Sequence, residues 1–230
     1  MNLSKLKEKV VEANLQLVDY GLVTLTWGNV SAIDRAEGIV VIKPSGVSYD
    51  DMKADDMVVI DMKGKTVEGK FRPSSDTPTH LELYKAFPSI GGITHTHSVY
   101  ATMFAQAHKE IPCFGTTHAD HFYGSIPLAR ELSEEEVEEA YEKHTGTAII
   151  ERFRDIDPLS VPGVLLASHA PFAWGKDAGE SVKNSLILER VAEMAFGTLQ
   201  LKNDAESIKK YIMDKHYNRK HGRNAYYGQE

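Results

Sequence analysis

The 230-residue sequence contains ten histidines, and two of them are separated by one residue in His95-Thr96-His97. Residues Ile93 to His97 follow Gly91-Gly92 and predict a β-strand. Because side chains two apart on a strand point to the same face, both imidazoles can reach one point. Neutral imidazole nitrogens bind Zn²⁺ and similar divalent metals. Two histidines hydrogen-bonded to backbone or water would give the same sequence, so the motif alone leaves both interpretations open.

Two further residues favour the metal interpretation. His169 follows the apolar run Val164 to Ala167, so it is expected at the end of a strand near the same sheet. Asp76 precedes a predicted helix, and its carboxylate can supply a fourth ligand. Three histidines plus one exchangeable position are typical of an open, catalytic metal site. The hydrolase pattern H-x-H-x-D-H does not fit, because Val99 stands where aspartate is required, and an amidohydrolase barrel usually needs a longer chain.

Three turns rich in small residues form a second group of candidates: Trp27-Gly28-Asn29, Lys43-Pro44-Ser45-Gly46 and Pro73-Ser74-Ser75-Asp76. Each ends a predicted strand or opens a predicted helix. Free backbone N–H groups and hydroxyls at such places can hold phosphate oxygens, and Lys43 adds a positive charge. Each turn alone is ordinary, but the third contains Ser75 directly before Asp76, the candidate metal ligand.

Hydrophobic spacing and capping residues predict the elements that must position these side chains. The predicted helices span about 3–17, 77–87, 98–108, 133–142 and 177–195, and a last one ends near Lys220. The predicted strands are Val23–Trp27, Gly38–Ile42, Ile93–His97 and a hairpin of Met57–Met62 with Lys65–Glu68. Thr77 and Ser98 are expected N-caps, and Ser133 with Glu136 forms a capping box. The pattern predicts a single α+β or α/β domain around a largely antiparallel sheet.

The overall composition excludes several classes of protein. A formal charge of −7 argues against a general nucleic-acid binder. The single cysteine, Cys113, excludes an internal disulfide framework and a cysteine-based zinc site. The start of the sequence does not resemble a secretion signal, and apolar runs such as Ile39–Ile42 are too short to cross a bilayer. We therefore expect a soluble, cytoplasmic protein with no membrane partner.

Several segments together resemble the class II aldolase family of sugar-phosphate enzymes, and the similarity covers essentially the whole chain. They are Leu25–Ser31, Ile42–Gly46, Pro73–His80, Thr94–Ser98, Gly115–Asp120, Ser168–Gly175, Lys215–Gly222 and Ala225–Gln229. Within the family, the sequence is most similar to the L-ribulose-5-phosphate 4-epimerases. The resemblance implies a three-layer α/β/α fold with a central, mostly antiparallel sheet, a single domain over 1–230, and a homotetramer with active sites at the subunit interfaces.

The resemblance also implies roles for individual residues. It places zinc on His95, His97 and His169, with Asp76 nearby as the acidic ligand. It places phosphate and substrate contacts at Gly28, Asn29, Ser45, Gly46, Ser74 and Ser75, with Lys43 adjacent. It makes Asp120 and Tyr227 the acid/base pair, Tyr227 coming from a neighbouring subunit, and it makes Thr116 and His216 supporting residues.

The implied reaction is a zinc-dependent epimerisation at C4 of L-ribulose 5-phosphate, giving D-xylulose 5-phosphate by retro-aldol cleavage and re-addition. An aldolase of the same family is the nearest alternative; related fuculose-phosphate aldolases carry glutamate where Asp76 stands. A non-enzymatic, adducin-like interaction head is a remoter one, because such heads lack the metal histidines. The sequence does not fix the metal, since manganese or cobalt also suit such sites, nor the pathway, which can be arabinose or ascorbate breakdown.

Overall fold

The computed structural model describes residues 2–227, so Gly228 and Gln229 of the C-terminal segment lie outside the described residues. The helices are α1 (Leu3–Asp19), α2 (Thr77–Ala86), α3 (Val99–Gln106), α4 (Thr116–Ala119), α5 (Glu134–Arg152), α6 (Ala178–Leu201) and α7 (Lys210–His221), with the 3-10 turn η1 (Ala54–Asp56). The strands are β1 (Asn29–Asp34), β2 (Ile39–Ile42), β3 (Val58–Asp61), β4 (Thr66–Glu68), β5 (Gly92–His95), β6 (Leu128–Ala129), β7 (Gly163–Leu166) and β8 (Pro171–Gly175).

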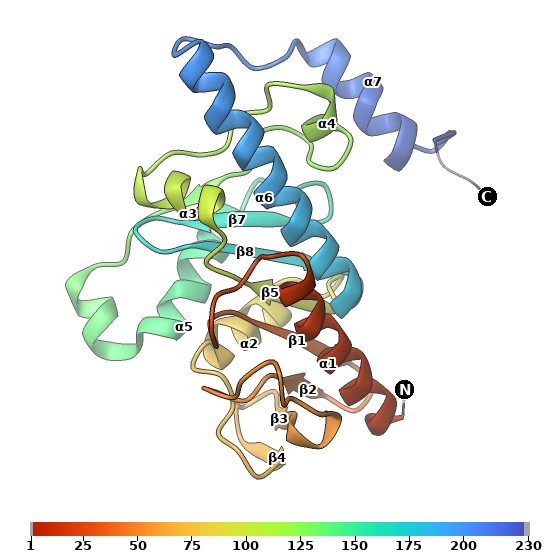
Figure 1. Cartoon of the computed structure of the whole chain (residues 1–230), viewed down its shortest axis with the longest axis vertical. Helices are drawn as coiled ribbons and strands as arrows, with labels where there is room; N and C mark the ends of the chain where they lie inside the picture. The colour runs from red at the N-terminus through yellow and green to blue at the C-terminus, as the bar shows by residue number, and fades with distance from the viewer. Residues whose placement is uncertain (1, 228–230) are drawn as a thin grey trace.

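The strands form one eight-stranded sheet in the order β4-β3-β2-β1-β5-β8-β7-β6 (Figure 1). Neighbouring strands pair antiparallel except β6 and β7, which are parallel. This confirms the predicted, mostly antiparallel sheet. In the register of β1 and β5, Asn29 lies directly opposite His95. Two segments singled out in the sequence therefore meet at one end of adjacent central strands.

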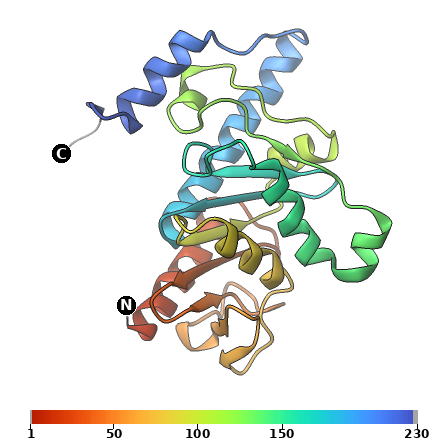
Figure 2. The same ribbon diagram turned by 180° about the vertical axis from the view of Figure 1, so that it is seen from behind.

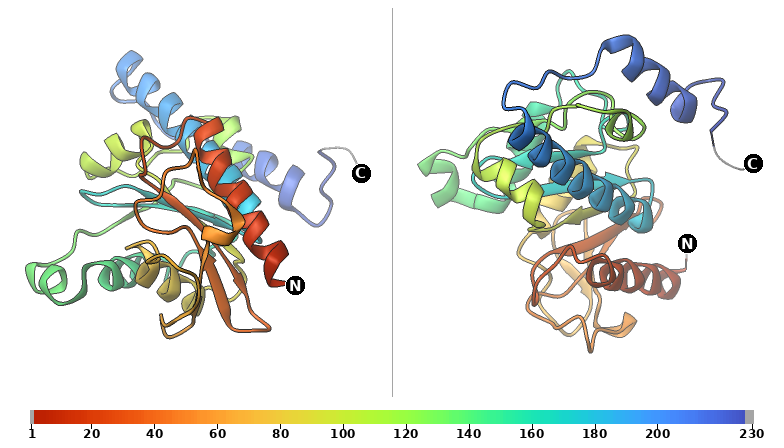
Figure 3. Two further views of the ribbon diagram at one scale, coloured as in Figure 1. Left: turned by 60° about the horizontal axis from the view of Figure 1, so that its bottom comes forward. Right: turned by 45° about the horizontal axis from the view of Figure 1, so that its top comes forward.

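Helices cover both faces of this sheet. In the left view of Figure 3, α1, α3 and α6 lie on one side of the strands, and α2 and α5 lie on the other. Figure 2, seen from behind, has α2 and α5 in front of the sheet. Successive residues of β2 explain the layering: Val40 and Ile42 belong to the core that includes Leu83 of α2, whereas Val41 belongs to the core that includes Leu17 of α1. The expected three-layer α/β/α fold is confirmed.

Helices α4 and α7 lie away from these layers, at the upper end of the molecule in Figure 1 and in the right view of Figure 3. None of the residues of α7 is buried. It is tied back by the Ile208 N–H, which donates to the Cys113 carbonyl at 2.9 Å, and by Tyr123, whose hydroxyl donates to Asp214 at 2.6 Å. No helix among residues 2–227 is long and apolar enough to span a membrane.

The predicted strand Val23–Trp27 is wrong, because β1 begins only at Asn29. Residues 25 and 26 form a turn, Leu25 has a φ of +54°, and the Trp27 N–H donates to the Thr24 carbonyl at 3.1 Å. The apolar side chains that suggested the strand are exposed, 78% for Leu25 and 53% for Trp27. Alternation without burial does not make a strand.

Three predicted boundaries also need correction. Strand β5 ends at His95, so His97 lies beyond the strand. Helix α2 begins at Thr77 with Asp76 as its N-cap, one residue before the expected cap. Helix α5 does not end near Glu142 but continues to Arg152 across a break at Ala140. The Ser133 capping box is confirmed.

Ser98 stands at the expected N-cap position of α3, but its side chain makes no capping hydrogen bond. The buried carboxylate of Glu189 on α6 replaces it by accepting from the N–H groups of Tyr100 and Ala101, both at 2.9 Å. This cap anchors the segment that follows His97. A tertiary contact from a distant helix therefore fixes the loop that carries a candidate ligand.

Candidate metal centre and active site

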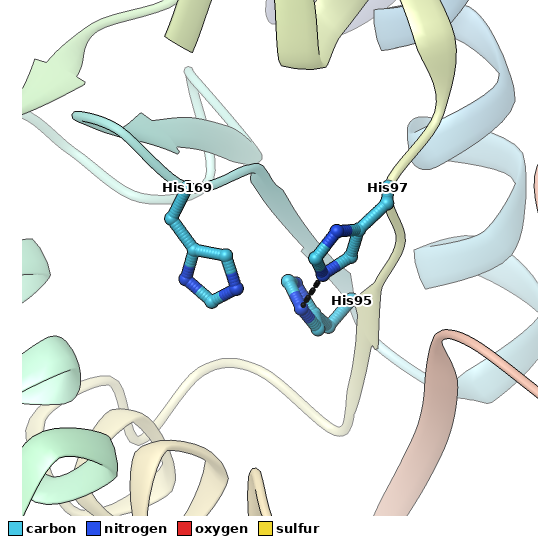
Figure 4. Close-up of side chains that lie close together, drawn as sticks. All are labelled: His95, His97 and His169. Carbon is cyan, nitrogen blue, oxygen red and sulfur yellow. Dashed lines mark hydrogen bonds between the residues drawn. The ribbon is translucent and has the colours of Figure 1, made fainter. Parts of the chain in front are cut away.

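The three predicted histidines come together at the end of the central strands (Figure 4). His95 is the last residue of β5 and is buried, His97 follows it and is exposed, and His169 lies half-buried in the turn between β7 and β8. One nitrogen from each ring lies within 4.8 Å of the other two. The convergence that the H-x-H spacing suggested is thus present, although only His95 belongs to the strand.

Hydrogen bonding shows which nitrogens face the centre. His95 Nδ1 lies 2.9 Å from the carbonyl oxygen of Pro171, which can only accept, so Nδ1 carries a hydrogen and Nε2 is the nitrogen that faces the centre. That Nε2 faces Nε2 of His97 at 3.2 Å. The His95 ring stacks on Phe172, with ring centroids 4.1 Å apart. Two ring nitrogens at this distance need a proton or a cation between them, because their lone pairs would otherwise repel each other.

The environment favours uncharged rings. Although His97 as a whole is exposed, its ring is partly enclosed by its neighbours, and this partial burial, with the nearby His95 ring, lowers the pKa of His97 to about 4. Burial, with both neighbouring rings, lowers the pKa of His169 to about 3. At neutral pH these histidines therefore offer lone pairs rather than N–H⁺ groups. A cluster of three imidazoles that contains these two rings fits zinc or a similar divalent metal.

Asp76, predicted as a fourth ligand, lies beside the three histidines but is not part of their cluster. Its Oδ2 accepts a 2.6 Å hydrogen bond from Asn29 Nδ2. Burial acts to raise the pKa of Asp76, but His95, His80 and the Asn29 hydrogen bond outweigh it, so the pKa lies below its usual value. Asp76 is therefore an anion next to the centre, and its role as a ligand stays a prediction.

The three predicted small-residue turns adjoin one another and the histidines. The Ser74 N–H donates to the Lys43 carbonyl, and the Ser45 N–H donates to the Arg72 carbonyl, both at 3.0 Å. Ser74 and Ser75 lead directly to Asp76. The turn at Gly28 lies against β5, since a Cβ on Gly28 would be 2.9 Å from the His95 carbonyl oxygen. These contacts place the predicted substrate residues around one site.

Lys43 is the cation of this group and is only 2% exposed. Its Nζ donates to the carbonyl oxygens of Thr26 and Pro44 at 3.3 and 3.4 Å and lies 4.8 Å from the Tyr49 ring centroid. Burial lowers the pKa of Lys43 to about 8. A buried ammonium with only long contacts to carbonyls is well suited to accept an anionic ligand.

Asp120 forms a second cluster, with residues of α7. Its carboxylate accepts from Arg219 Nε at 2.9 Å and Nη2 at 2.5 Å, and from His216 Nδ1 at 3.1 Å. The Arg219 guanidinium also lies 4.5 Å from the ring centroid of Tyr227, which is 57% exposed. Thr116 opens α4, and its carbonyl accepts from the Asp120 N–H at 2.9 Å. The four predicted acid/base and supporting residues are therefore neighbours.

The Asp120 cluster and the three histidines belong to different parts of one chain. Asp120 and Tyr227 lie with α4 and α7, whereas the histidines lie at the ends of β5 and β7 (Figure 1). Within residues 2–227, no hydrogen bond or ion pair joins the two groups. Among the described residues of one chain, the candidate residues thus form two separate groups.

The sequence analysis did not predict several residues that contact the candidate residues of these two groups. Tyr141 contacts His169, Tyr49 lies below Lys43, and Glu189 caps the helix after His97. Arg219 was also missed, although it lies in the segment 215–222 whose resemblance to the class II aldolase family could have indicated it. Tyr141 falls within the predicted helix 133–142, where nothing in the local sequence indicates a contact with His169.

Comparison with known proteins places this arrangement in a family. The sequence profile of the class II aldolase and adducin N-terminal domain matches residues 8–196. The chain belongs to this family. The matched class II aldolase segment contains all three histidines, Asp76, Lys43 and Asp120, and it ends before α7.

Solved structures share the class II aldolase fold. An L-fuculose 1-phosphate aldolase superposes with a TM-score of 0.78 at 24% identity, covering 94% of this chain and 95% of that one. YgbL from Klebsiella pneumoniae, a putative aldolase/epimerase/decarboxylase, gives 0.75 at 22% identity over 94% and 99%. The L-fuculose-1-phosphate aldolase from Thermus thermophilus gives 0.68 at 19% identity over 89% and 99%. At these identities the likeness establishes the fold, a single α/β domain.

Proposed function

We propose that this class II aldolase family member is a zinc-dependent epimerase that interconverts L-ribulose 5-phosphate and D-xylulose 5-phosphate at C4. The observation that carries the proposal is the meeting of three histidine ring nitrogens beside the buried Lys43 and the three small-residue turns, which together we call the phosphate cradle. His95, His97 and His169 would hold the metal, with Asp76 adjacent. A divalent metal bound there supplies Lewis-acid polarisation of the substrate carbonyl.

The cradle retains the phosphate. Lys43 supplies the positive charge, and the turns at Gly28-Asn29, Ser45-Gly46 and Ser74-Ser75 supply backbone N–H groups and hydroxyls. Asn29 Oδ1 is buried and has no hydrogen-bond partner among the described residues, so it is free to accept from a substrate hydroxyl. A phosphate held at this place keeps the cleaved fragment in the site.

Inversion at C4 requires breaking a carbon–carbon bond, because the hydrogen on C4 is not acidic. Loss of the C4 hydroxyl proton lets the C3–C4 bond break, and its electron pair moves toward the C2 carbonyl. The aldehyde fragment turns, C3 attacks its other face, and the new C4 oxygen takes up a proton. Asp120 and Tyr227 would serve the two faces, one for each epimer.

A homotetramer with shared active sites fits the two separate groups. Within residues 2–227 of one chain, Asp120 and Tyr227 make no hydrogen bond or ion pair with the three histidines, so a neighbouring subunit would have to bring these residues to the metal centre. The protruding, wholly unburied α7 supports this assembly.

A sugar-phosphate aldolase is the second candidate, favoured by the two L-fuculose-phosphate aldolases that share the fold. The presence of aspartate at position 76 favours the epimerase. Incubation with L-ribulose 5-phosphate separates them: conversion to D-xylulose 5-phosphate in a coupled assay supports the epimerase, whereas accumulation of free aldehyde supports the aldolase. Zinc analysis of the purified protein tests the adducin-like alternative, which predicts no bound metal.

A further inference from the structure

Helix α5 is broken at Ala140, where φ is −165° and ψ is 75°. The break separates an acidic half, Glu134–Glu139, which is mostly exposed, from a second half with the buried residues Thr145 and Ala148. Tyr141 is the first residue after the break and is half-buried. Because the helical path changes here, Tyr141 need not follow the solvated face of the acidic half.

The second half of α5 is held tightly on α2. A Cβ on Gly146 would lie 2.8 Å from Glu82 Cβ and 3.3 Å from the Thr79 carbonyl oxygen, so only glycine permits this approach. The Thr79 hydroxyl also donates to the Glu142 carbonyl at 2.5 Å. These contacts fix the backbone beside Tyr141 relative to α2, whose N-cap is Asp76.

Tyr141 thereby reaches the metal centre. Its hydroxyl lies 3.3 Å from His169 Nδ1, and the ring centroids are 6.0 Å apart. In Figure 4, His169 turns one ring nitrogen toward His95 and His97 and the other away from them. Since Nδ1 meets Tyr141, the converging nitrogen is Nε2. Within residues 2–227, no other side chain hydrogen-bonds the His169 ring.

A histidine that binds metal through Nε2 carries its hydrogen on Nδ1, and the acceptor of that hydrogen fixes the tautomer and the ring orientation. His95 has such an acceptor in the Pro171 carbonyl. His169 needs one as well, because it lies in a turn next to Ser168, whose φ is +59°. The phenolic oxygen of Tyr141 can fill this role.

We propose that Tyr141 is a positioning residue of the metal centre: its hydroxyl oxygen accepts the Nδ1–H of His169 and holds Nε2 of that ring toward the metal. The inference rests on the proposed metal centre and adds a residue to it. This role gives a function to the break at Ala140, because the change of helix direction after the acidic first half of α5 brings Tyr141 from a surface helix to the edge of the site.

The test is Tyr141→Phe, which removes only the hydroxyl. We expect zinc affinity, measured by competition with a chelator, to fall about 10- to 100-fold, the usual cost of losing a hydrogen-bond partner of a metal ligand. Tyr100→Phe is the matched control, because Tyr100 is also half-buried and packs on Phe196 of α6. The control should bind zinc like the wild type, and the metal-free Tyr141→Phe protein should melt like the wild type.

A second measurement detects orientation directly. Nitrogen-15 NMR of the metal-free protein should show His169 protonated on Nδ1 in the wild type and a mixture of tautomers in Tyr141→Phe. Zinc affinity within twofold of the wild type, or an unchanged tautomer, would overturn the role of Tyr141 alone. A wild-type protein that binds no zinc would instead refute the proposed function and this inference with it.

Discussion

Substitution of Gly28 by alanine tests how the chain positions its metal centre. Gly28 has a φ of +73°, and an added Cβ would lie 2.8 Å from Val23 Cγ1 and 2.9 Å from the His95 carbonyl oxygen. The first neighbour is a side chain that can move, but the second is the backbone of a candidate metal ligand. Gly28→Ala must therefore displace either its own turn or the end of β5.

The magnitude follows from two additive costs. A non-glycine residue in the left-handed region costs about 1–2 kcal/mol. Overpacking against fixed atoms adds about 1–3 kcal/mol. Gly21→Ala is the matched control, because Gly21 has a φ of +65° but no atom within 4 Å of its would-be Cβ. The difference between the two variants isolates the packing cost of about 1–3 kcal/mol.

The assay is urea unfolding of the metal-free proteins at one fixed protein concentration, since assembly makes apparent stability concentration-dependent. Zinc affinity is measured in parallel by competition with a chelator. We expect it to fall about 10-fold in Gly28→Ala, because the contact that supports a metal ligand is disturbed. In Gly21→Ala we expect zinc affinity to stay unchanged. Equal unfolding free energies for the two variants, with equal zinc affinities, would refute the claim that the Gly28 turn braces His95.

Three further outcomes are expected. His97→Asn should lose metal and activity together; full zinc occupancy in that protein would contradict the ligand assignment. Tyr227→Phe should lower turnover about 10²- to 10⁴-fold with unchanged zinc content, and wild-type turnover would remove Tyr227 from the mechanism. Because burial depresses the pKa of Lys43 to about 8, its ammonium loses its charge as pH rises through that value, so KM for the sugar phosphate should climb above pH 8. In Lys43→Arg, which keeps its charge, KM should stay flat, and a flat wild-type profile from pH 7 to 9 would argue against phosphate binding by Lys43.

Local sequence was sufficient to predict much of the fold and the three histidines of the candidate metal centre. The short apolar runs of β2 and β3, the Ser133 capping box and the end of the last helix near Lys220 all follow from local sequence, and each is present in the structure. The H-x-H motif predicted convergence because only one residue separates the two histidines, so both side chains stay near the end of the strand that leads into them. The similarity of its segments to known class II aldolases supplied the remaining candidate residues.

The tertiary structure alone decided which of these residues meet. The tie between Tyr141 and His169 requires a break in α5 and the close packing of Gly146 on α2, neither of which leaves a local signal. Glu189 caps α3 across 88 residues of sequence, and Val23–Trp27 is a loop because no strand covers its apolar side chains. The pairing of Asp120 with Arg219, away from the histidines, likewise depends on where α7 packs. Sequence periodicity records which face of an element is buried, whereas contacts between distant elements depend on how all the layers pack at once.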